Sequence, residues 1–354
     1  MHWGYGHASR CVPIIKTLIS NGAEPVVAAD REIRSYLSAE FRDLESAEIP
    51  SWPVTYPDKG PFYLHFLKSL KSFQKFIKKE TSLLDELIND LHIDAVISDN
   101  RYGMYSDKVP SIFITHQLNI PAGFLSVPVN AYAHHFIKKF TKCWVPDFQN
   151  EHALAGKLSQ NNGRLKNLEY IGPISRFEAI GENEVKDIDI LAVISGPEPH
   201  RTNFEALLLS QMNEISGKHV LVRGNDSKLK SNVKNHIRIV NHADSKLLNQ
   251  LYSHSKFVVC RSGYSSIMDL TALGIKALLI PTPYQKEQEY LAHYHSDNNA
   301  FLIQAQETMN LNQGLEQLAK KSASAQETTV ENKKKGNSHS LLNSSIKKFL
   351  DSVA

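Results

Sequence analysis

The feature that most constrains the fold of this 354-residue chain is a repeated alternation of short apolar runs with longer segments of helical periodicity. Each apolar run is rich in β-branched or aromatic residues and ends in polar or turn residues, which is typical of a buried strand. In the first half we expect strands within residues 24–30, 93–100, 110–117 and 142–147. In the second half we expect them within residues 189–196, 218–226, 236–244, 256–263 and 275–283.

Near-continuous apolar strands that alternate with helices predict parallel sheets covered by helices on both faces. The alternation breaks in a polar, Gly/Asn-rich stretch at residues 151–175. We therefore predict an α/β chain of two doubly wound, Rossmann-like domains facing across a cleft. The expected segments are an N-terminal domain (1–150), a linker (151–175), a C-terminal domain (176–325), and a polar segment with a C-terminal helix (326–354). The stretch 322–340 is polar enough to predict a loose surface segment, and residues 340–352 predict one amphipathic helix.

Composition excludes several classes of protein. A net charge of +3 is too small to argue for a nucleic-acid partner. Cys11, Cys143 and Cys260 lie far apart in apolar settings, which favours reduced thiols over a disulfide framework or a zinc site. No apolar run approaches the ~18 residues of a membrane span, and the first residues lack the pattern of a signal peptide. We expect a cytoplasmic protein.

Polar and glycine residues gather where the predicted strands end. In open parallel sheets, ligands bind outside the carboxyl ends of the strands, so these residues predict a large polar ligand or two ligands meeting there. The endings are 98–100, 115–117, 195–196, 223–225, 241–242 and 261–263.

The segment Cys260–Ala292 carries the strongest pattern. Ser262-Gly263 ends a strand just before a predicted helix, and backbone N–H groups at a helix N-terminus bind anions. Asp269 lies two turns into that helix, and a proline-rich turn then leads to Gln285 and Gln288. A carboxylate and amides suit the hydroxyls of ribose and sugars. The alternative for Asp269 is an ordinary solvated helix residue.

This segment resembles the donor site of the GT-B glycosyltransferases of family 28, which include the UDP-GlcNAc transferase of peptidoglycan synthesis. The resemblance implies that Arg261, Ser262 and Gly263 bind the donor and that Asp269 holds the ribose, where the family has Glu. Gln288 matches one glutamine of a pair near the sugar, whereas Glu289 replaces its partner and leaves the sugar identity open.

Three further segments resemble the same family, so that the likeness covers most of the chain. Residues 4–10 resemble its N-terminal glycine loop ending in His, residues 116–123 its next acceptor-side loop, and residues 170–176 the entry to the second domain. The implied acceptor-side residues are Gly4, Gly6, His116, Gln117 and Asn119. Arg176 is implied to lie near the donor diphosphate.

In this family the glycine loop follows a central first strand, but only three residues precede Gly4 here. A missing central strand would expose backbone edges, which is an aggregation liability. Either the start is set too late or trimmed, or another segment replaces the strand, and we favour a mis-set or trimmed start.

The chemistry of sugar transfer assigns the remaining roles. The leaving diphosphate gathers negative charge, which helix N-termini and cations can stabilise without a metal. The candidates are Ser195, Gly196, Arg201, Arg176 and the Ser262-Gly263 turn. We expect neither a metal nor another cofactor.

The acceptor hydroxyl needs a base. His7 is the first candidate because imidazole titrates near neutral pH and the neighbouring glycines permit close approach. Asp99 is the second, as a base or as the group that orients His7. His242 either lines the base pocket through its backbone or is a solvated turn residue.

Residues 60–80 form a basic amphipathic pattern. Phe62, Phe66, Leu70, Phe73 and Ile77 share one helical stripe, and the opposite side carries Lys68, Lys71, Lys75, Lys78 and Lys79. Such a helix either lies on an anionic membrane, as a lipid-linked acceptor would require, or buries its stripe in the core and solvates its lysines.

These observations predict an inverting, metal-independent glycosyltransferase that moves a sugar, with GlcNAc favoured, from UDP to an acceptor hydroxyl. The partners are a nucleotide-sugar donor and an unidentified acceptor, for which a lipid-linked molecule at the inner face of the membrane is one choice. The alternatives are a UDP-sugar hydrolase on the same fold, in which His7 activates water, and a non-catalytic nucleotide-sugar-binding protein.

Overall fold

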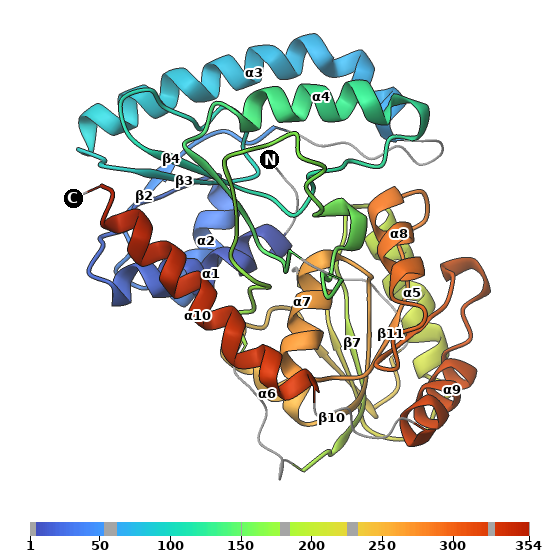
Figure 1. Cartoon of the computed structure of the whole chain (residues 1–354). Coiled ribbons are helices and arrows are strands. Elements are labelled where there is room, and N and C mark those ends of the chain that lie inside the picture. Colours follow the sequence, from blue (N-terminus) through green and yellow to red (C-terminus); the bar gives the residue numbers. More distant parts are fainter. Residues whose placement is uncertain are drawn as a thin grey trace. The chain divides into compact units, whose positions relative to one another are not determined.

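The computed structural model describes residues 5–52, 62–149, 151–177, 185–224, 233–324 and 330–353 (Figure 1). The chain divides into two compact units. The first consists chiefly of His7–Ile174 together with the C-terminal residues from Lys334, and the second chiefly of Ser175–Lys333.

The second unit contains a six-stranded parallel sheet in the order β12-β11-β10-β7-β8-β9. Its strands are β7 (Ile188–Val193), β8 (His219–Val222), β9 (Ile237–Val240), β10 (Ser255–Cys260), β11 (Ala277–Leu279) and β12 (Phe301–Ile303). Its helices are α5 (His200–Met212), α6 (Ser245–Ser253), α7 (Tyr264–Leu273), α8 (Lys286–Tyr294), the 3-10 turn η3 (Gln306–Thr308) and α9 (Leu311–Ser324).

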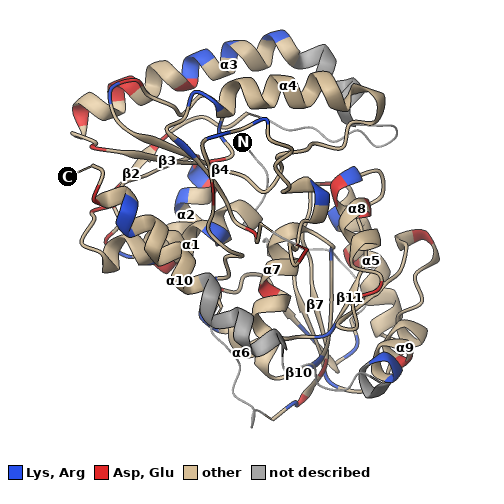
Figure 2. Cartoon of the chain, in the orientation of Figure 1, with Lys and Arg blue, Asp and Glu red and all other residues tan. Residues whose placement is uncertain are grey.

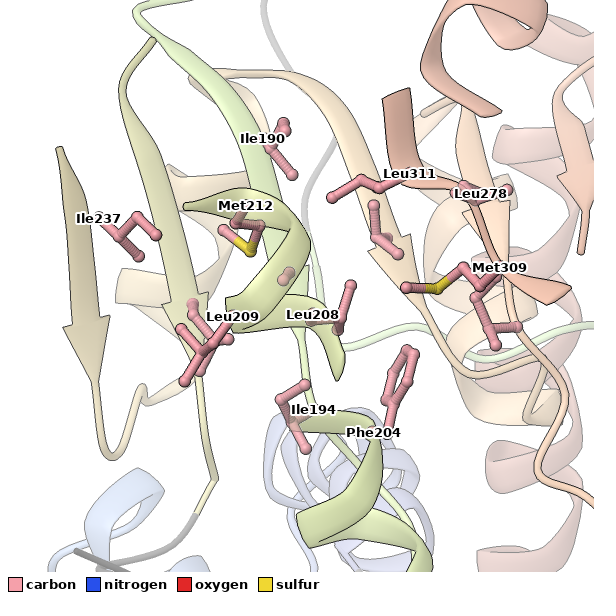
Figure 3. Close-up of a cluster of buried hydrophobic side chains, with 14 of the residues drawn as sticks. Ile190, Ile194, Phe204, Leu208, Leu209, Met212, Ile237, Leu278, Met309 and Leu311 are labelled. Atoms are coloured by element: carbon pink, nitrogen blue, oxygen red, sulfur yellow. The ribbon is translucent and has the colours of Figure 1, made fainter. Parts of the chain in front are cut away.

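The helices of the second unit cover both faces of its sheet. On one face, apolar side chains of α5 and α9 pack against those of β7, β8 and β11, and Figure 3 shows Phe204, Leu208 and Met212 of α5 beside Ile190 and Leu278. Right-handed crossovers place α6, α7 and α8 on the opposite face. The strands are buried on both sides, which explains their near-continuous apolar sequences.

The first unit contains two parallel sheets. The strands β1 (Val27–Ala29) and β2 (Ser46–Glu48) form a pair, and β3 (Val96–Asp99), β4 (Ser111–Ile114), β5 (Lys142–Val145) and β6 (Leu168–Tyr170) form a sheet in that order. The helices are α1 (Tyr5–Ser20), α2 (Arg31–Glu40), α3 (Phe62–Asp90), α4 (Ser126–Ile137) and α10 (Val330–Leu350), with 3-10 turns η1 (Gly123–Leu125) and η2 (Gly156–Leu158).

The apolar stripe of α3 faces the interior of the first unit where its side chains are described. Phe73 and Ile77 are buried against Phe136 of α4, whereas Lys71, Lys75, Lys78 and Lys79 are exposed. Figure 2 shows the basic segments along α3. The side chains of Phe62, Phe66 and Lys68 lie outside the described residues, so the core-facing alternative is confirmed for the second half of the stripe only.

The α/β prediction is confirmed, and each of the nine predicted strands is present. Three strands were missed. β2 is a largely exposed three-residue strand that pairs with β1. β6 lies in the predicted linker, and β12 lies in a segment for which the sequence analysis predicted no strand. Edge strands need less apolar sequence, so they give a weaker signal.

Two segments differ from the sequence-based division. Residues 151–174 cluster with the first unit, because β6 pairs with β5 and extends its sheet. The polar stretch 322–340 includes the end of α9 and the first half of α10, so both of its flanks are helical.

The C-terminal helix α10 packs on the first unit. Leu342, Ile346 and Phe349 join a buried cluster with Ile14 of α1, and Phe349 meets the buried ring of Trp144 edge-on with the ring centroids 5.8 Å apart. Figure 1 shows α10 alongside α1. Among the described residues, no helix is long and apolar enough to cross a membrane.

We predict that Phe349→Ala lowers the free energy of unfolding of the first unit by about 3–5 kcal/mol, because it leaves a cavity beside Trp144. The measurement is urea unfolding followed by tryptophan fluorescence. Lys348→Ala, which truncates an exposed neighbour on the same helix, is the control and should change little. Equal effects of the two substitutions would show that α10 does not contribute to the core of the first unit.

Candidate active site

In the first unit, two strand ends and one helix bring four polar side chains together. Asp99 is the last residue of β3 and pairs in register with Ile114 of β4, so His116 follows at the same edge of the sheet. His7 and Arg10 lie one turn apart in α1, and side chains three positions apart share a helix face.

Asp99 is the centre of this cluster. Its Oδ2 lies 3.0 Å from Nδ1 of His7, and its Oδ1 accepts hydrogen bonds from Nε of Arg10, at 2.9 Å, and from Nη2. Nη1 of Arg10 also lies 3.4 Å from Nδ1 of His116. An arginine only donates, so Nδ1 of His116 is an acceptor here.

The electrostatics keep Asp99 ionised and His7 neutral. Burial by itself would raise the pKa of Asp99, but the Arg10 guanidinium and His7 together hold it well below its usual range. The pKa of His7 is lowered from 6.5, first because burial disfavours the imidazolium and then because Arg10 repels it.

The tautomer of His7 follows from these charges. Nδ1 lies near both Asp99 and Nη2 of Arg10, the latter at 2.8 Å. Because Nη2 donates to Oδ1 of Asp99, we assign the Nδ1 proton of His7 to the bond with Oδ2 of the ionised carboxylate, which is the strong acceptor. The lone pair then lies on Nε2, and His7 can accept a proton from an acceptor hydroxyl while Asp99 stabilises the imidazolium that forms.

Arg10 is the functional residue that the sequence analysis missed. It is only 3% exposed, and its guanidinium contacts all three of the residues predicted separately, His7, Asp99 and His116. The available signal was the i, i+3 spacing of His7 and Arg10 on a predicted helix. A buried arginine requires an anion nearby, and Asp99 was one of three strand-end carboxylates predicted in the first half, with Asp30 and Asp147.

A buried ion pair holds the loop that follows Asp99. Glu80 of α3 is fully buried and accepts from Nε of Arg101 at 2.9 Å and from the backbone N–H of Gly103 at 3.1 Å. A Cβ on Gly103 would lie 2.5 Å from the carbonyl oxygen of Ile77, so only glycine permits this approach. The sequence analysis did not single out Glu80.

The other predicted acceptor-side residues lie in different elements of the chain. Gln117 lies in the loop after β4, and its N–H donates to Oγ1 of Thr115. The Asn119 side chain donates to the carbonyls of Lys157 and Gln160, at 2.8 and 2.7 Å, and so fixes this loop to η2. Gly6 lies in the first turn of α1, and Gly4 lies outside the described residues.

In the second unit, several of the predicted donor residues follow two adjacent strand ends. β7 lies between β8 and β10. The connection after β7 leads to β8, whereas the connection after β10 leads the other way, to β11, and ligands bind at such switch points. Val193 and Cys260 pair at the ends of β7 and β10. The loops beginning at Ile194 and Arg261 therefore start side by side, and they lead into the N-termini of α5 and α7.

Arg261 supports this region from inside. Its side chain is fully buried, lies over the ring of Phe204 and donates to the carbonyls of His200, Ile280 and Pro281. Burial lowers the pKa of Arg261 to about 9. Arg261 thus ties together the loops after β7, β10 and β11, whereas the sequence analysis expected it to touch the donor.

The loop after β11 contains two buried oxygens without a hydrogen-bond partner among the described residues, Oγ1 of Thr282 and Oε1 of Gln285. Gln288 is buried: its Oε1 accepts from the N–H of Thr282 at 2.8 Å, and its carbonyl accepts from Ser262. Glu289 accepts from the N–H of Tyr284 and from Lys286. Glu289 therefore has a structural partner on each carboxylate oxygen.

Asp269 lies on α7 beside the entry to the second unit. It is 8% exposed, accepts from Oγ of Ser175 at 2.7 Å and is attracted by the charge of Arg176. Burial outweighs these two contacts and raises the pKa of Asp269 to about 6. Arg176 and Asp269, which were predicted separately, therefore lie near one another.

The remaining donor candidates differ in exposure. Ser195 and Gly196 are exposed, and the φ of +107° at Gly196 favours glycine. His242 is exposed after β9, two strands from the switch point. Arg201 is buried and donates to the carbonyl of Arg223.

Comparisons with known proteins bear on these two sets of residues. Residues 207–343 match the model of the glycosyltransferase family 28 C-terminal domain. This match indicates a glycosyltransferase whose C-terminal part is similar to family 28. An uncharacterized glycosyltransferase of Methanosarcina acetivorans is 26% identical over 307 residues, covering 81% of this chain and 79% of the relative.

A second relative is the UDP-N-acetylglucosamine–N-acetylmuramyl-(pentapeptide) pyrophosphoryl-undecaprenol N-acetylglucosamine transferase of Listeria monocytogenes. It is 24% identical over 323 residues, which cover 82% of this chain and 85% of the relative.

Solved structures support the fold of this glycosyltransferase. The glycotransferase of kitacinnamycin matches with a TM-score of 0.64 at 12% identity, covering 99% of this chain and 97% of that one. MurG of Acinetobacter baumannii matches with a TM-score of 0.52 at 15% identity, covering 98% and 97%. The fold is GT-B, as predicted.

We predict that Arg10→Gln raises the pKa of His7, because the substitution removes a repelling cation. A neutral base is lost as pH falls through its pKa, so the acid limb of kcat/KM for sugar transfer lies below pH 6.5 in the wild type and moves upward in the variant. We also expect kcat to fall about tenfold or more as His7 loses its alignment.

The measurement is a pH–rate profile from pH 5 to 8, with an NMR titration of the histidines. Lys16→Gln removes an exposed cation from the same helix and serves as the control. An unchanged acid limb in Arg10→Gln would show that Arg10 does not act on the base.

Proposed function

We propose that this glycosyltransferase transfers GlcNAc from UDP-GlcNAc to a hydroxyl of a lipid-linked acceptor, with inversion and without a metal. The observation that carries the proposal is the His7–Asp99–Arg10 cluster, a neutral, half-buried imidazole oriented by an ionised carboxylate. Such a base suits deprotonation of a hydroxyl at neutral pH.

The proposed step is a single displacement. Nε2 of His7 takes the proton of the acceptor hydroxyl, whose oxygen attacks C1 of the sugar as the bond from C1 to the phosphate oxygen breaks. Attack from the face opposite UDP inverts the configuration at C1, and UDP leaves with the bonding electron pair.

The second unit supplies the groups that suit the donor. The N-termini of α5 and α7 at the switch point favour the diphosphate. Asp269 beside Ser175 and Arg176 suits the ribose hydroxyls, and the unpartnered oxygens of Thr282 and Gln285 suit donors on the sugar. The name of the Listeria relative supports UDP-GlcNAc and a polyprenol-linked acceptor.

We expect purified enzyme to release UDP from UDP-GlcNAc only when a membrane-lipid extract is present, and EDTA to leave the rate unchanged. His7→Gln should lower that rate at least about 100-fold, because a positioned base contributes ~10²–10⁴. The assay is UDP release from a panel of UDP- and TDP-sugars, with and without extract, followed by NMR of the anomeric proton in the product.

Four outcomes would contradict parts of the proposal. Release without extract would favour the hydrolase, turnover of another nucleotide-sugar alone would change the donor, and full activity of His7→Gln would remove the base. A product with retained configuration would exclude the single displacement.

We also propose that the lysine face of α3, Lys71, Lys75, Lys78 and Lys79, contacts the anionic surface that carries the acceptor. These side chains are exposed, whereas Phe73 and Ile77 on the other side of the helix are buried, so the contact would be electrostatic.

Replacing these four lysines with Gln should weaken binding to phosphatidylglycerol vesicles at least tenfold, since each surface lysine contributes about 1 kcal/mol. Vesicle co-sedimentation is the measurement, with phosphatidylcholine vesicles as the uncharged reference. The control replaces four exposed lysines of the second unit, Lys218, Lys234, Lys246 and Lys256. Equal loss in both variants would indicate net charge alone.

A further inference from the structure

The start of α5 already holds an internal anion. Oε2 of Glu198 accepts the backbone N–H of Thr202, in the first turn of α5, at 3.1 Å. Oε1 of the same carboxylate accepts from Nη1 of Arg201 at 3.2 Å. Glu198 thus occupies the donors that an anion at this helix N-terminus would use.

In this arrangement the carboxylate of Glu198 forms an ion pair with the guanidinium of Arg201. Arg201 is buried, with 8% of its side chain exposed, and its second nitrogen donates to the carbonyl of Arg223 at 2.5 Å. The Glu198 side chain, by contrast, is 54% exposed. Burial opposes its ionisation, but Thr202 and Arg201 together outweigh it and hold the pKa of Glu198 below its ordinary value. The carboxylate is therefore charged at neutral pH and has room to move outward.

An independent observation points to a ligand at this position. Thr282 is only 2% exposed, and its Oγ1 has no hydrogen-bond partner among the described residues. That oxygen lies 3.9 Å from where a Cβ on Gly196 would be, and among the described residues, the two chain neighbours apart, no other atom comes within 4 Å of that point. Thr282 thus aims an unsatisfied hydroxyl at the open side of the loop leading to Glu198, where a polar ligand would satisfy it.

We propose that Glu198 is a further residue that sets donor affinity: its carboxylate holds the anion position at the start of α5, and the donor diphosphate displaces it on binding. This inference rests on the proposed function, because it takes the ligand of the switch point to be a nucleoside diphosphate. The departing carboxylate moves into solvent, and the diphosphate takes over the N–H of Thr202 and the guanidinium of Arg201.

The displacement costs the same free energy in the ground state and in the transition state of sugar transfer. It therefore weakens donor binding uniformly, which raises KM for the donor and leaves kcat unchanged. A neutral amide at position 198 keeps an oxygen for the N–H of Thr202 but competes far less for Arg201.

The experiment compares the wild type with Glu198→Gln. We expect the Kd for UDP, measured by isothermal titration calorimetry, and KM for UDP-GlcNAc both to fall about tenfold in the variant. kcat should stay within about twofold. Inorganic pyrophosphate, which lacks the nucleoside, should show the same preference for the variant. Glu214→Gln removes an equal charge from the C-terminal end of the same helix, about 20 Å away at 1.5 Å per residue, and should change neither constant.

Each other result would overturn the inference in a distinguishable way. Equal affinities of wild type and Glu198→Gln would reduce Glu198 to a helix cap, and weaker binding by the variant would make it a supporting residue of the site. If Glu214→Gln matched Glu198→Gln, the effect would be long-range charge. If no nucleoside diphosphate bound either protein, the proposed function itself would fail.

Discussion

The structure depends first on a constraint of parallel β-sheets. A strand can join a parallel neighbour only through a crossover, so helices cover both faces and every strand delivers its last residue to the same edge. Apolar side chains fill most strand positions, and polar side chains gather where the strands end. The polar groups considered for catalysis or donor binding accordingly lie at strand ends, in the loops that follow them, or in the first turns of the helices.

In the first unit the consequence is electrostatic. A carboxylate at the end of β3 loses most of its water, and the nearest compensation is the guanidinium of Arg10. That pairing makes Asp99 a permanent anion and His7 a neutral base, since the cation that stabilises one group repels the protonated form of the other. Glu80 and Arg101 form a second carboxylate–guanidinium pair, which fixes the loop that follows Asp99.

In the second unit the consequence is a shortage of compensating groups. Two helix N-termini lie at the switch point, yet Arg261 and Arg201 both donate hydrogen bonds to backbone carbonyls. Glu198 neutralises one terminus, while the buried oxygens of Thr282 and Gln285 find no partner among the described residues. A polar, anionic ligand relieves both conditions, which is the physical basis for placing the donor here.

The sequence by itself determined the fold class, nine of the strands, and the separate candidates His7, Asp99, His116 and Asp269. Strand composition and strand endings are local properties of the sequence, so they can be recognised without knowing which strands are neighbours in the sheet. Short edge strands such as β2, β6 and β12 carried too little apolar sequence to be found in this way.

Only the tertiary structure decided which strand ends are adjacent. The pairing of β3 with β4 joins Asp99 to His116, and the pairing of β7 with β10 creates the switch point, although more than sixty residues separate those strands. The tertiary structure also decided which charged side chains already have partners. From the sequence alone Arg261, Arg201 and Glu289 could each bind a ligand, but in the fold each has hydrogen-bond partners. Burial and charge compensation are properties of the assembled chain, because they depend on groups that meet only after the sheets form.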